Sequence, residues 1–360
     1  MSEFKNDDKK LLEKVEKVKA DRKKSGIDSL VGKLQFAVIN VEMQYLNGAA
    51  QEMTEYTGYA PAYAFEDAAS ANIVMEEKSS ADIIIRARKE GDNPFREYND
   101  YPKSKSLINT RLETFAFLTD DIEKYFNIQK SRAISFLTDE IQDMGEYLYV
   151  QTEPSKYTGI STGIIQWKGE KGNYRTVNSN DIGIGFMVDK PDYANKIGFF
   201  DHAAIRVRAC DRDNAIIEFM NITNYDFEFS IYVKSLNSIT NVARLSAEEF
   251  ALVFTSGIGP YESDEKSGPT EKFIHNYGPR VHHMAFITQD IEEIFEYLKY
   301  DGLEFLSELV GSEQEGLRQA FSQESKCTFI VNEYIQRYGK FDGFFTKGNV
   351  EELTRATEKQ

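Results

Sequence analysis

Cysteine is scarce in this chain, and long apolar runs are missing. Only Cys210 and Cys327 are cysteines among 360 residues, and they lie far apart without Cys-x-x-Cys spacing. This excludes a disulfide framework and fits a reducing compartment. No stretch is long and apolar enough for a signal peptide or a membrane span. We therefore expect a soluble, cytoplasmic protein with no membrane partner.

Positive charge is also in short supply. The chain holds 43 Lys and Arg against 59 Asp and Glu, which gives a formal net charge of −16. Such a chain repels phosphate backbones, so nucleic acid is not an expected partner. Residues 1–28 are rich in charge of both signs, with Leu11, Leu12, Val15 and Val18 at helical spacing. This segment is predicted to be a charged helix or tail that docks weakly or helps the chain to dimerise.

The chain does have enough apolar material for a large core. Hydrophobic residues make up 41% and aromatic residues 13% of a chain that is longer than one average domain. Strand-like and helix-like segments recur in the order βαβββ, four times over. The predicted fold is α+β, with four βαβββ modules paired into two open, barrel-like domains at residues 29–190 and 198–360.

The two predicted domains repeat one another in sequence. Phe115-Ala-Phe-Leu-Thr-Asp-Asp-Ile-Glu matches Met284-Ala-Phe-Ile-Thr-Gln-Asp-Ile-Glu at an offset of 284 − 115 = 169. A shift of 170 lays Ser155-Lys-Tyr-Thr over Ser325-Lys-Cys-Thr. Two independent blocks at nearly one offset indicate an internal duplication.

Histidine is limited to four residues, and two of them fit a metal site. The last predicted strand, 328–336, carries a single carboxylate, Glu333, on the same face as core residues. A buried carboxylate needs a partner, and a metal ion is the most economical one. His202 and His283 lie on two other predicted strands. Two imidazoles and one carboxylate form the facial triad of non-haem Fe(II) oxygenases, so these three residues are predicted to be catalytic ligands of Fe(II).

The remaining histidines and the sister half act as internal controls. His282 is expected to point to the opposite face of its strand, and His275 is expected in a loop. The repeat places Phe36, Thr114 and Gly163 of the first domain at the positions of the triad, and none of them can bind a metal in the same way. The triad therefore belongs to a function of the second domain alone.

The segments around the triad together resemble the vicinal-oxygen-chelate superfamily, and within it the 4-hydroxyphenylpyruvate dioxygenase family. The likeness is clear across residues 199–357, weak across 30–190 and absent before that. The motifs that carry it are Phe200-Asp-His-Ala, Gly278-Pro-Arg-Val-His-His-Met-Ala-Phe, and Asn332-Glu-Tyr-Ile-Gln-Arg-Tyr-Gly followed by Gly343-Phe-Phe-Thr-Lys-Gly-Asn.

This resemblance implies iron at the triad, a small aromatic 2-oxo acid chelated by that iron, and O2 as co-substrate. It implies oxidative decarboxylation followed by ring hydroxylation to a homogentisate-like product, a step of tyrosine catabolism. Phe344 and Phe345 would stack near the substrate ring beneath a closing C-terminal helix, Val350 to Thr357.

Two departures from the family pattern bear on the substrate. The gap from His283 to Glu333 is 333 − 283 = 50 residues, shorter than in typical members. The polar residues that hold the substrate in the family fall here on Val242, Thr255 and Thr270. Nearby polar residues can replace them, so the predicted substrate-binding set is Phe344, Phe345, Asn241, Ser246, Thr255 and Ser256.

Other functions fit the same residues. An extradiol-type ring-cleaving dioxygenase would use the same ligands on catechols. A non-catalytic protein that binds a small aromatic molecule would bind its ligand without turnover. A homo-oligomer, either a dimer or a tetramer, is expected in each case.

Overall fold

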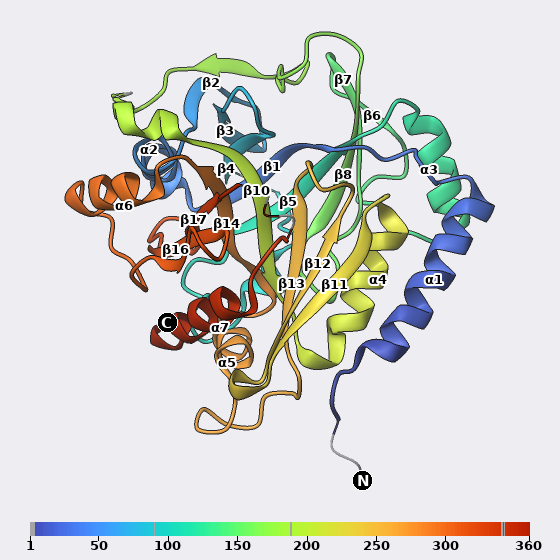
Figure 1. Ribbon diagram of the computed structural model, residues 1–360. Coiled ribbons are helices and arrows are strands. Elements are labelled where there is room, and N and C mark those ends of the chain that lie inside the picture. The colour runs from blue at the N-terminus through green and yellow to red at the C-terminus, as the bar shows by residue number, and fades with distance from the viewer. Residues whose placement is uncertain (1–3, 90, 188, 340, 342) are drawn as a thin grey trace.

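Two curved, mixed sheets form the frame of the molecule (Figure 1). The computed structural model describes residues 4–89, 91–187, 189–339, 341 and 343–360. The first sheet has the strand order β6-β7-β8-β5-β1-β4-β3-β2-β9, and the second has the order β11-β12-β13-β10-β14-β17-β16-β15.

Residues 34–182 supply the nine strands of the first sheet and, in their described part, the two helices α2 and α3. The strands are β1 (Leu34–Val41), β2 (Ala60–Glu66), β3 (Ser70–Glu76), β4 (Asp82–Arg88), β5 (Arg111–Leu118), β6 (Gln142–Asp143), β7 (Tyr147–Gln151), β8 (Ser161–Trp167) and β9 (Asn180–Ile182). The helices are α2 (Leu46–Tyr56) and α3 (Ile122–Ser131).

The second half supplies the eight strands of the second sheet and four helices. Its strands are β10 (Ile197–Arg206), β11 (Asp226–Val233), β12 (Ser238–Arg244), β13 (Ala251–Gly257), β14 (Arg280–Thr288), β15 (Val310–Ser312), β16 (Leu317–Glu324) and β17 (Val331–Arg337). Its helices are α4 (Arg212–Ile222), α5 (Pro269–Tyr277), α6 (Ile291–Tyr300) and α7 (Lys347–Ala356).

Each sheet is built from two βαβββ modules. The first strands of the two modules pair antiparallel at the centre, β1 with β5 and β10 with β14. Each of these central strands then pairs in parallel with the last strand of its own module, which is β4, β8, β13 or β17. The predicted α+β fold of four paired modules is confirmed.

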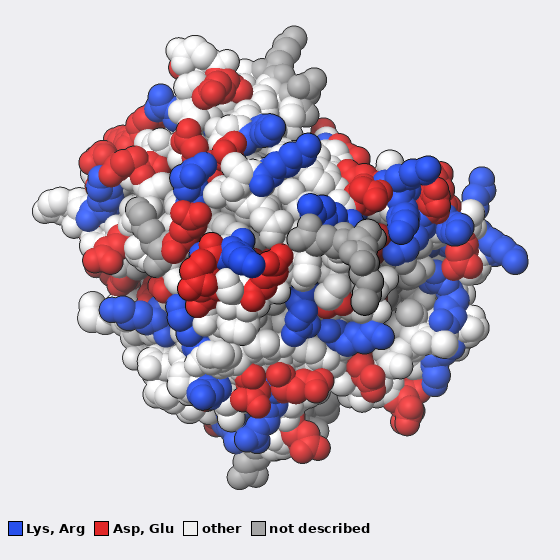
Figure 2. All heavy atoms as spheres, turned by 90° about the horizontal axis from the view of Figure 1, so that it is seen from below, with Lys and Arg blue, Asp and Glu red and all other residues white. Residues whose placement is uncertain are grey.

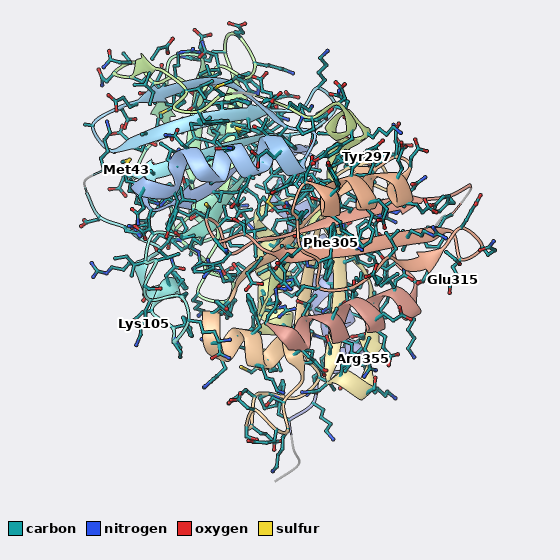
Figure 3. The ribbon with its side chains drawn as sticks, turned by 90° about the vertical axis from the view of Figure 1, so that its left-hand side faces the viewer. Met43, Lys105, Tyr297, Phe305, Glu315 and Arg355 are labelled. Carbon is teal, nitrogen blue, oxygen red and sulfur yellow. The ribbon has the colours of Figure 1, made fainter. Side chains whose placement is uncertain are left out.

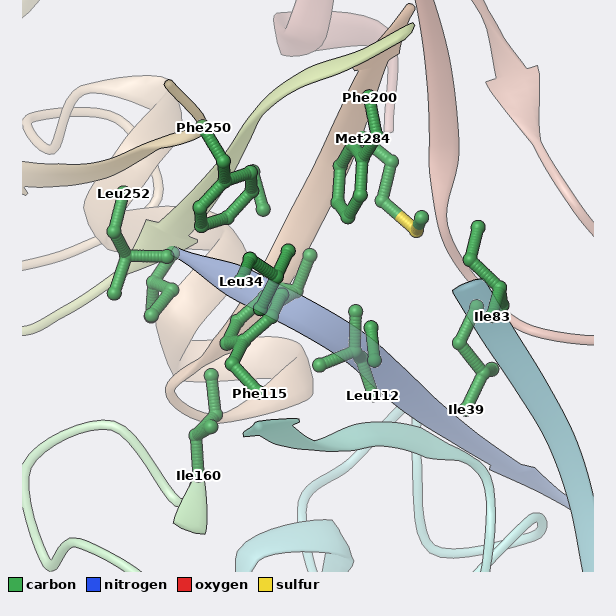
Figure 4. Packing of buried hydrophobic residues seen from close by; sticks show 14 of the residues in the cluster. Leu34, Ile39, Ile83, Leu112, Phe115, Ile160, Phe200, Phe250, Leu252 and Met284 are labelled. Carbon is green, nitrogen blue, oxygen red and sulfur yellow. The ribbon is translucent and has the colours of Figure 1, made fainter. Parts of the chain in front are cut away.

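The main core lies between the two sheets and under the helices. Alternation along β1 sends Ala37 and Ile39 into this core, while Phe36 and Val38 face the concave side of the sheet. Figure 4 shows the first sheet meeting the second, where the ring centroids of Phe115 and Phe250 lie 5.5 Å apart. Each large apolar side chain buried here stabilises the fold by about 1.5–3 kcal/mol.

Helix α1 (Asp8–Ser25) is packed into the fold, where a weakly docked extension was expected. It lies beside α4 of the second half (Figure 1) and buries Leu11, Val15 and Val18. The buried Arg22 donates to a carboxylate oxygen of Asp226 at 2.7 Å. The apolar stripe and this ion pair attach the charged helix to the second half of the chain.

The last strand begins three residues later than predicted. The hydroxyl oxygen of Ser325 accepts hydrogen bonds from the backbone N–H groups of Cys327 and Thr328, and Phe329 has φ of +60°. A local side-chain turn therefore competes with the strand until Val331. The matching residues Ser155 and Gly159 make the same turn in the first half, which supports the duplication.

Helices α6 and α7 flank β16 and β17 (Figure 3), with Tyr297 on α6 and Arg355 on α7. The predicted closing helix begins earlier than expected, at Lys347, because the Thr346 side chain caps it by accepting from the backbone N–H of Asn349. Its place under the second sheet brings α7 next to α5 (Figure 1).

Two observations bear on the surface. No helix in the described part of the chain is long and apolar enough to cross a membrane. On the face shown in Figure 2, acidic and basic side chains are interspersed.

Candidate metal centre

Three side chains from three strands meet on the concave side of the second sheet. His202 of β10, His283 of β14 and Glu333 of β17 each offer a ligand atom, and these atoms all lie within 4.8 Å of one another. The side chains are buried, with exposed fractions of 0%, 8% and 1%. This is the only such group among the residues that the structure describes.

Strand register explains why residues so far apart in sequence converge. His202 and Glu333 lie opposite the same residue, Ala285, on the two sides of β14. His283 pairs with Ala204 of β10, which lies two residues from His202 and therefore on the same face of that strand. The curvature of the sheet then turns the three side chains toward one another.

The donor atoms have the arrangement that a cation requires. One carboxylate oxygen of Glu333 lies 3.0 Å from Nε2 of His202 and 3.3 Å from Nε2 of His283. Nε2 of His202 is buried, and apart from this carboxylate oxygen it has no polar partner among the described residues. Two imidazole nitrogens and a carboxylate oxygen that converge in this way fit a divalent transition metal.

Asp201 orients His202. Its carboxylate lies 2.8 Å from Nδ1 of His202 and pairs with both terminal nitrogens of Arg337, at 2.6 and 2.9 Å. Burial lowers the pKa of His202, but the charge of Glu333 and the hydrogen bond with Asp201 outweigh it and raise that pKa to about 9. Metal binding therefore has to displace a proton from Nε2 of His202.

A chain of hydrogen bonds sets the tautomer of His283. Gln360 places its amide oxygen 2.8 Å from Nε2 of His282, and Nδ1 of His282 lies 2.9 Å from Nδ1 of His283. If His282 donates to Gln360, its Nδ1 accepts from Nδ1–H of His283, which leaves Nε2 of His283 as a free lone pair. Burial lowers the pKa of both histidines well below the usual range, which keeps them neutral.

The prediction that His282 faces away from the site needs correction. A register shift between the Ala204–His283 and Ile205–Val281 pairs places a β-bulge at His282. The bulge breaks the alternation of side chains, so His282 lines the same cavity as His283.

The side-chain amides of Asn349 and Gln319 form a chain of hydrogen bonds that ends at Glu333. The amide nitrogen of Gln319 donates to Oε1 of Glu333, and the amide oxygen of Gln319 accepts from Asn349 of α7 at 2.9 Å. Outer partners of this kind orient ligands and are commonly required for metal affinity. Helix α7 therefore contributes to the position of one candidate ligand, and its own side chains line the cavity.

Comparisons with known proteins were made at the level of sequence and of structure. No family model matches the sequence, and no curated protein does. Many solved structures share its fold, and three of them are compared below. A triple mutant of 4-hydroxymandelate synthase from Streptomyces coelicolor is 14% identical, with a TM-score of 0.68 over 91% of this chain and 98% of the other.

The second structure is a xylose isomerase-like TIM barrel/4-hydroxyphenylpyruvate dioxygenase fusion protein, 14% identical with a TM-score of 0.62. The match covers 92% of this chain and 53% of the fusion protein. The third is an Mn(II)-bound glyoxalase from Novosphingobium aromaticivorans, 10% identical with a TM-score of 0.50 over 86% of this chain and 83% of the other. The fold is of the vicinal-oxygen-chelate type.

In this vicinal-oxygen-chelate fold His283 and Glu333 of the triad line a cavity of about 50 Å³, enough for a few water molecules. Its apolar lining includes Val253, Phe321, Phe345, Val350 and Leu353, and its polar lining includes Arg206, Ser238, Thr240, Thr255, Thr270 and Gln319.

Only some of the predicted substrate-binding residues line this cavity. Phe345 and Thr255 line it. Phe344 packs edge-on against the ring of His202, with centroids 5.4 Å apart, and Phe345 does so at 5.1 Å.

Three of the predicted substrate residues lie outside the lining. Asn241 follows Thr240 on β12 and Ser256 follows Thr255 on β13, so alternation turns both to the other side of the sheet. Asn241 donates there to the carbonyl of Phe254. Ser246 is exposed beyond the end of β12.

Sequence reasoning missed Arg206 and Gln319 in the lining. Arg206 stands four residues after His202 on the same strand, and this even spacing could have found it. His275 was expected in a loop but lies in α5, where its ring stacks on Tyr261 at 4.1 Å between centroids.

A larger cavity, of about 400 Å³, opens between the two halves. It is lined by apolar residues such as Phe115 and Phe254 and by the carboxylates of Glu153 and Glu218. Because neither histidine nor cysteine lines it, the smaller cavity is the candidate metal centre.

Proposed function

We propose that the protein is an Fe(II)-dependent dioxygenase that acts on an aryl 2-oxo acid, similar to 4-hydroxyphenylpyruvate dioxygenase. The observation that carries the proposal is the convergence of the buried side chains of His202, His283 and Glu333. A facial set of two histidines and one carboxylate leaves coordination positions free for substrate and O2, which is typical of non-haem Fe(II) oxygenases.

The protein's own side chains would prepare the site for this metal. Bound Fe(II) would supply O2 reduction coupled to loss of CO2 from the 2-oxo acid. Asp201 keeps a proton on Nδ1 of His202 so that Nε2 faces the metal position. Gln319 fixes the carboxylate of Glu333 in the same way. Such fixed partners reduce the reorganisation needed when the metal binds.

The aromatic nature of the substrate is supported by the residues over the triad. Phe344 and Phe345 place two rings beside His202 and exclude water from that side. Two structural neighbours are named for 4-hydroxymandelate and for 4-hydroxyphenylpyruvate, both hydroxyphenyl acids. An aryl acid needs more room than about 50 Å³, so Phe345 and α7 would move outward to admit it.

The proposal assigns different roles to the parts of the chain. Residues 198–360 would be the catalytic pair of modules, and residues 29–190 would be a scaffold without metal ligands. Residues 1–28 would add the helix that fastens the second half. We also propose a homo-oligomer, a dimer or a tetramer, in the cytoplasm.

Anaerobic reconstitution with Fe(II) tests the proposal. We expect one iron per chain by elemental analysis, with O2 uptake and CO2 release when phenylpyruvate or 4-hydroxyphenylpyruvate is added. His283→Ala should lose both iron and turnover. His275→Ala is the matched control because its side chain is exposed in α5, and it should retain both.

Two other outcomes would redirect the assignment. Ring cleavage of catechols without CO2 release from arylpyruvates would point to an extradiol-type dioxygenase. Binding of an arylpyruvate that survives His283→Ala, with no iron and no turnover, would show a binding protein and would end the enzyme proposal.

A further inference from the structure

Arg206 is a cation buried in the candidate metal centre. It follows His202 by four residues on β10, so both side chains lie on the concave face, and it lines the cavity with His282, His283 and Glu333. Only 4% of its surface is exposed. The second half therefore buries a guanidinium group in the cavity of its candidate metal centre.

This guanidinium lacks a counter-charge. Nη1 of Arg206 has no hydrogen-bond partner, and no carboxylate in the described part of the chain forms an ion pair with it. Burial lowers the pKa of Arg206 to about 9, and no neighbouring carboxylate offsets the effect. The other buried arginines each donate to a backbone carbonyl or a carboxylate; they are Arg22, Arg111, Arg212 and Arg280.

Structural contacts do not account for the buried charge. The guanidinium lies over the ring of Phe273, with its carbon 4.5 Å from the centroid. Such a contact is weaker than the penalty for burying an unpaired charge. A residue that costs stability in the free protein points to a missing partner of opposite charge.

The surroundings of Arg206 suit an anion. The hydroxyl groups of Ser238, Thr240, Thr255 and Thr270 line the same cavity. The hydroxyl oxygens of Ser238 and Thr270 lie 3.2 Å apart and can turn a proton toward a ligand. Guanidinium and hydroxyl donors together match the oxygen atoms of a carboxylate.

We propose that Arg206 binds a second anionic group of the substrate, a carboxylate at the end of the molecule that lies away from the metal. The inference rests on the proposed function for the metal-binding end. Arg206 lies four residue steps along the strand from His202, or about 13 Å between Cα atoms. A chelating 2-oxo acid, a ring and a terminal carboxylate can bridge such a distance. The substrate class is then a dicarboxylic aryl 2-oxo acid.

Binding of two matched acids tests this inference. Phenylpyruvate and 4-carboxyphenylpyruvate would be titrated anaerobically into the Fe(II)-loaded wild-type protein and into Arg206→Met, with calorimetry as the readout. We expect the wild type to prefer the carboxylated acid by at least about 30-fold, and Arg206→Met to lose that preference while it retains one iron per chain.

Two results would contradict this inference. Equal affinity of the wild type for the two acids would overturn the inference. So would an equal loss of affinity for both acids in Arg206→Met, because Arg206 would then bind the 2-oxo acid head itself. If the protein takes up no iron, the same titrations with the metal-free protein still compare the two acids, so the failure of the metal proposal is separate.

Thermal unfolding without ligand gives an independent measure. Arg206→Met should raise the melting temperature, because it removes an unpaired buried charge and keeps the packing on Phe273. Arg111→Met is the matched control, since Arg111 donates to four acceptors from Tyr98, Asn99, Thr158 and Pro279 and its loss should lower the melting temperature. A fall for Arg206→Met would indicate a structural role and contradict the proposal.

Discussion

The two halves of the chain place different chemistry in the same frame. In the first half Phe36, Ala116 and Gly163 lie side by side across three strands. In the second half His202, Ala285 and Glu333 occupy the equivalent row. The first row lies beneath a cluster of packed aromatic rings, whereas the second row carries two of the three residues of the candidate metal centre. The comparison teaches that the backbone of the module accepts either interior.

The filling of the first half explains why its described residues form no comparable site. Phe36, Tyr147, Tyr149 and Tyr174 form one buried cluster on the concave face. The ring centroids of Phe36 and Tyr174 are 4.9 Å apart. A Cβ atom at Gly163 would lie 2.8 Å from Cε2 of Tyr149 and closer still to its hydroxyl. The space that Glu333 uses in one half is taken by tyrosine in the other.

The residues next to the two rows also differ in charge between the halves. Trp167 donates its indole N–H to the Gln35 side chain at 3.0 Å, and the repeat places Arg337 and Asp201 at these positions in the second half. A neutral hydrogen bond thus corresponds to a charged pair. The charge is useful only where it orients a ligand, since Asp201 also contacts His202.

Giving the second half a residue of the first should have the largest effect. His283→Thr places there the residue that the first half has at Thr114 and removes one of the three proposed ligands. We expect metal affinity to fall by more than about 100-fold, beyond the usual effect of an outer-sphere partner, with turnover lost. Metal titration followed by elemental analysis checks this, and unchanged circular dichroism would show that the fold is retained. Unaltered iron content would contradict the assignment of His283.

The reverse exchange should cost stability. Gly163→Glu forces a side chain into the ring of Tyr149 and buries a carboxylate without a partner. We expect a loss of about 3 kcal/mol or more in the free energy of unfolding, measured with urea. Adding Tyr149→Gln, after Gln319 of the other half, should recover part of the loss. A single variant as stable as the wild type would show that the first interior is not tightly filled.

Removing the charge behind His202 should have a smaller effect. Asp201→Asn keeps the shape of the side chain but weakens its bonds to His202 and Arg337. We expect a 10- to 100-fold loss of metal affinity, in the range of about 10–100-fold for outer partners. Asp143→Asn, which alters an exposed carboxylate of the first half, should leave the affinity unchanged. Equal affinities of the two variants would remove Asp201 from the site.

The titration of one buried carboxyl group in the first half, Asp82, should change the stability of the protein but not its metal binding. This should be the smallest of the expected effects. Burial raises the pKa of Asp82 to about 6, against a hydrogen bond from the Tyr174 hydroxyl that lowers it. The folded state therefore binds more protons between about pH 4 and 6, so this group makes stability fall as pH rises through that window.

Asp82→Asn should then be more stable than the wild type by about 1–2 kcal/mol at pH 7.5, and the gap should close near pH 4. Urea unfolding at pH 4, 5.5 and 7.5 measures the gap. A gap that does not vary with pH would mean that burial does not perturb Asp82. Iron content should be the same in both proteins at every pH.

Much of the fold and the centre of the site could be predicted from residue patterns. Period-2 alternation on the last strand put Glu333 on a core face, and the repeat fixed His283 as the partner of Thr114. Both follow from local geometry, which strands obey wherever the register is regular.

The parts that could not be predicted depend on irregular backbone or on distant segments. The bulge at His282 turns that side chain into the cavity. Gln360, at the end of the chain, comes to within 2.8 Å of it. Asn241 and Ser256 lie next to the family's substrate positions in sequence, but alternation turns both side chains to the other face of the sheet.

Periodic and repeated patterns along the chain are enough to predict the duplication, the order of the modules and the three candidate ligands. Which side chains share the cavity, and the burial of Arg206 there without a counter-charge, become visible only in the folded chain. Burial and pairing depend on contacts between strands that lie far apart in sequence, and no local pattern records such contacts.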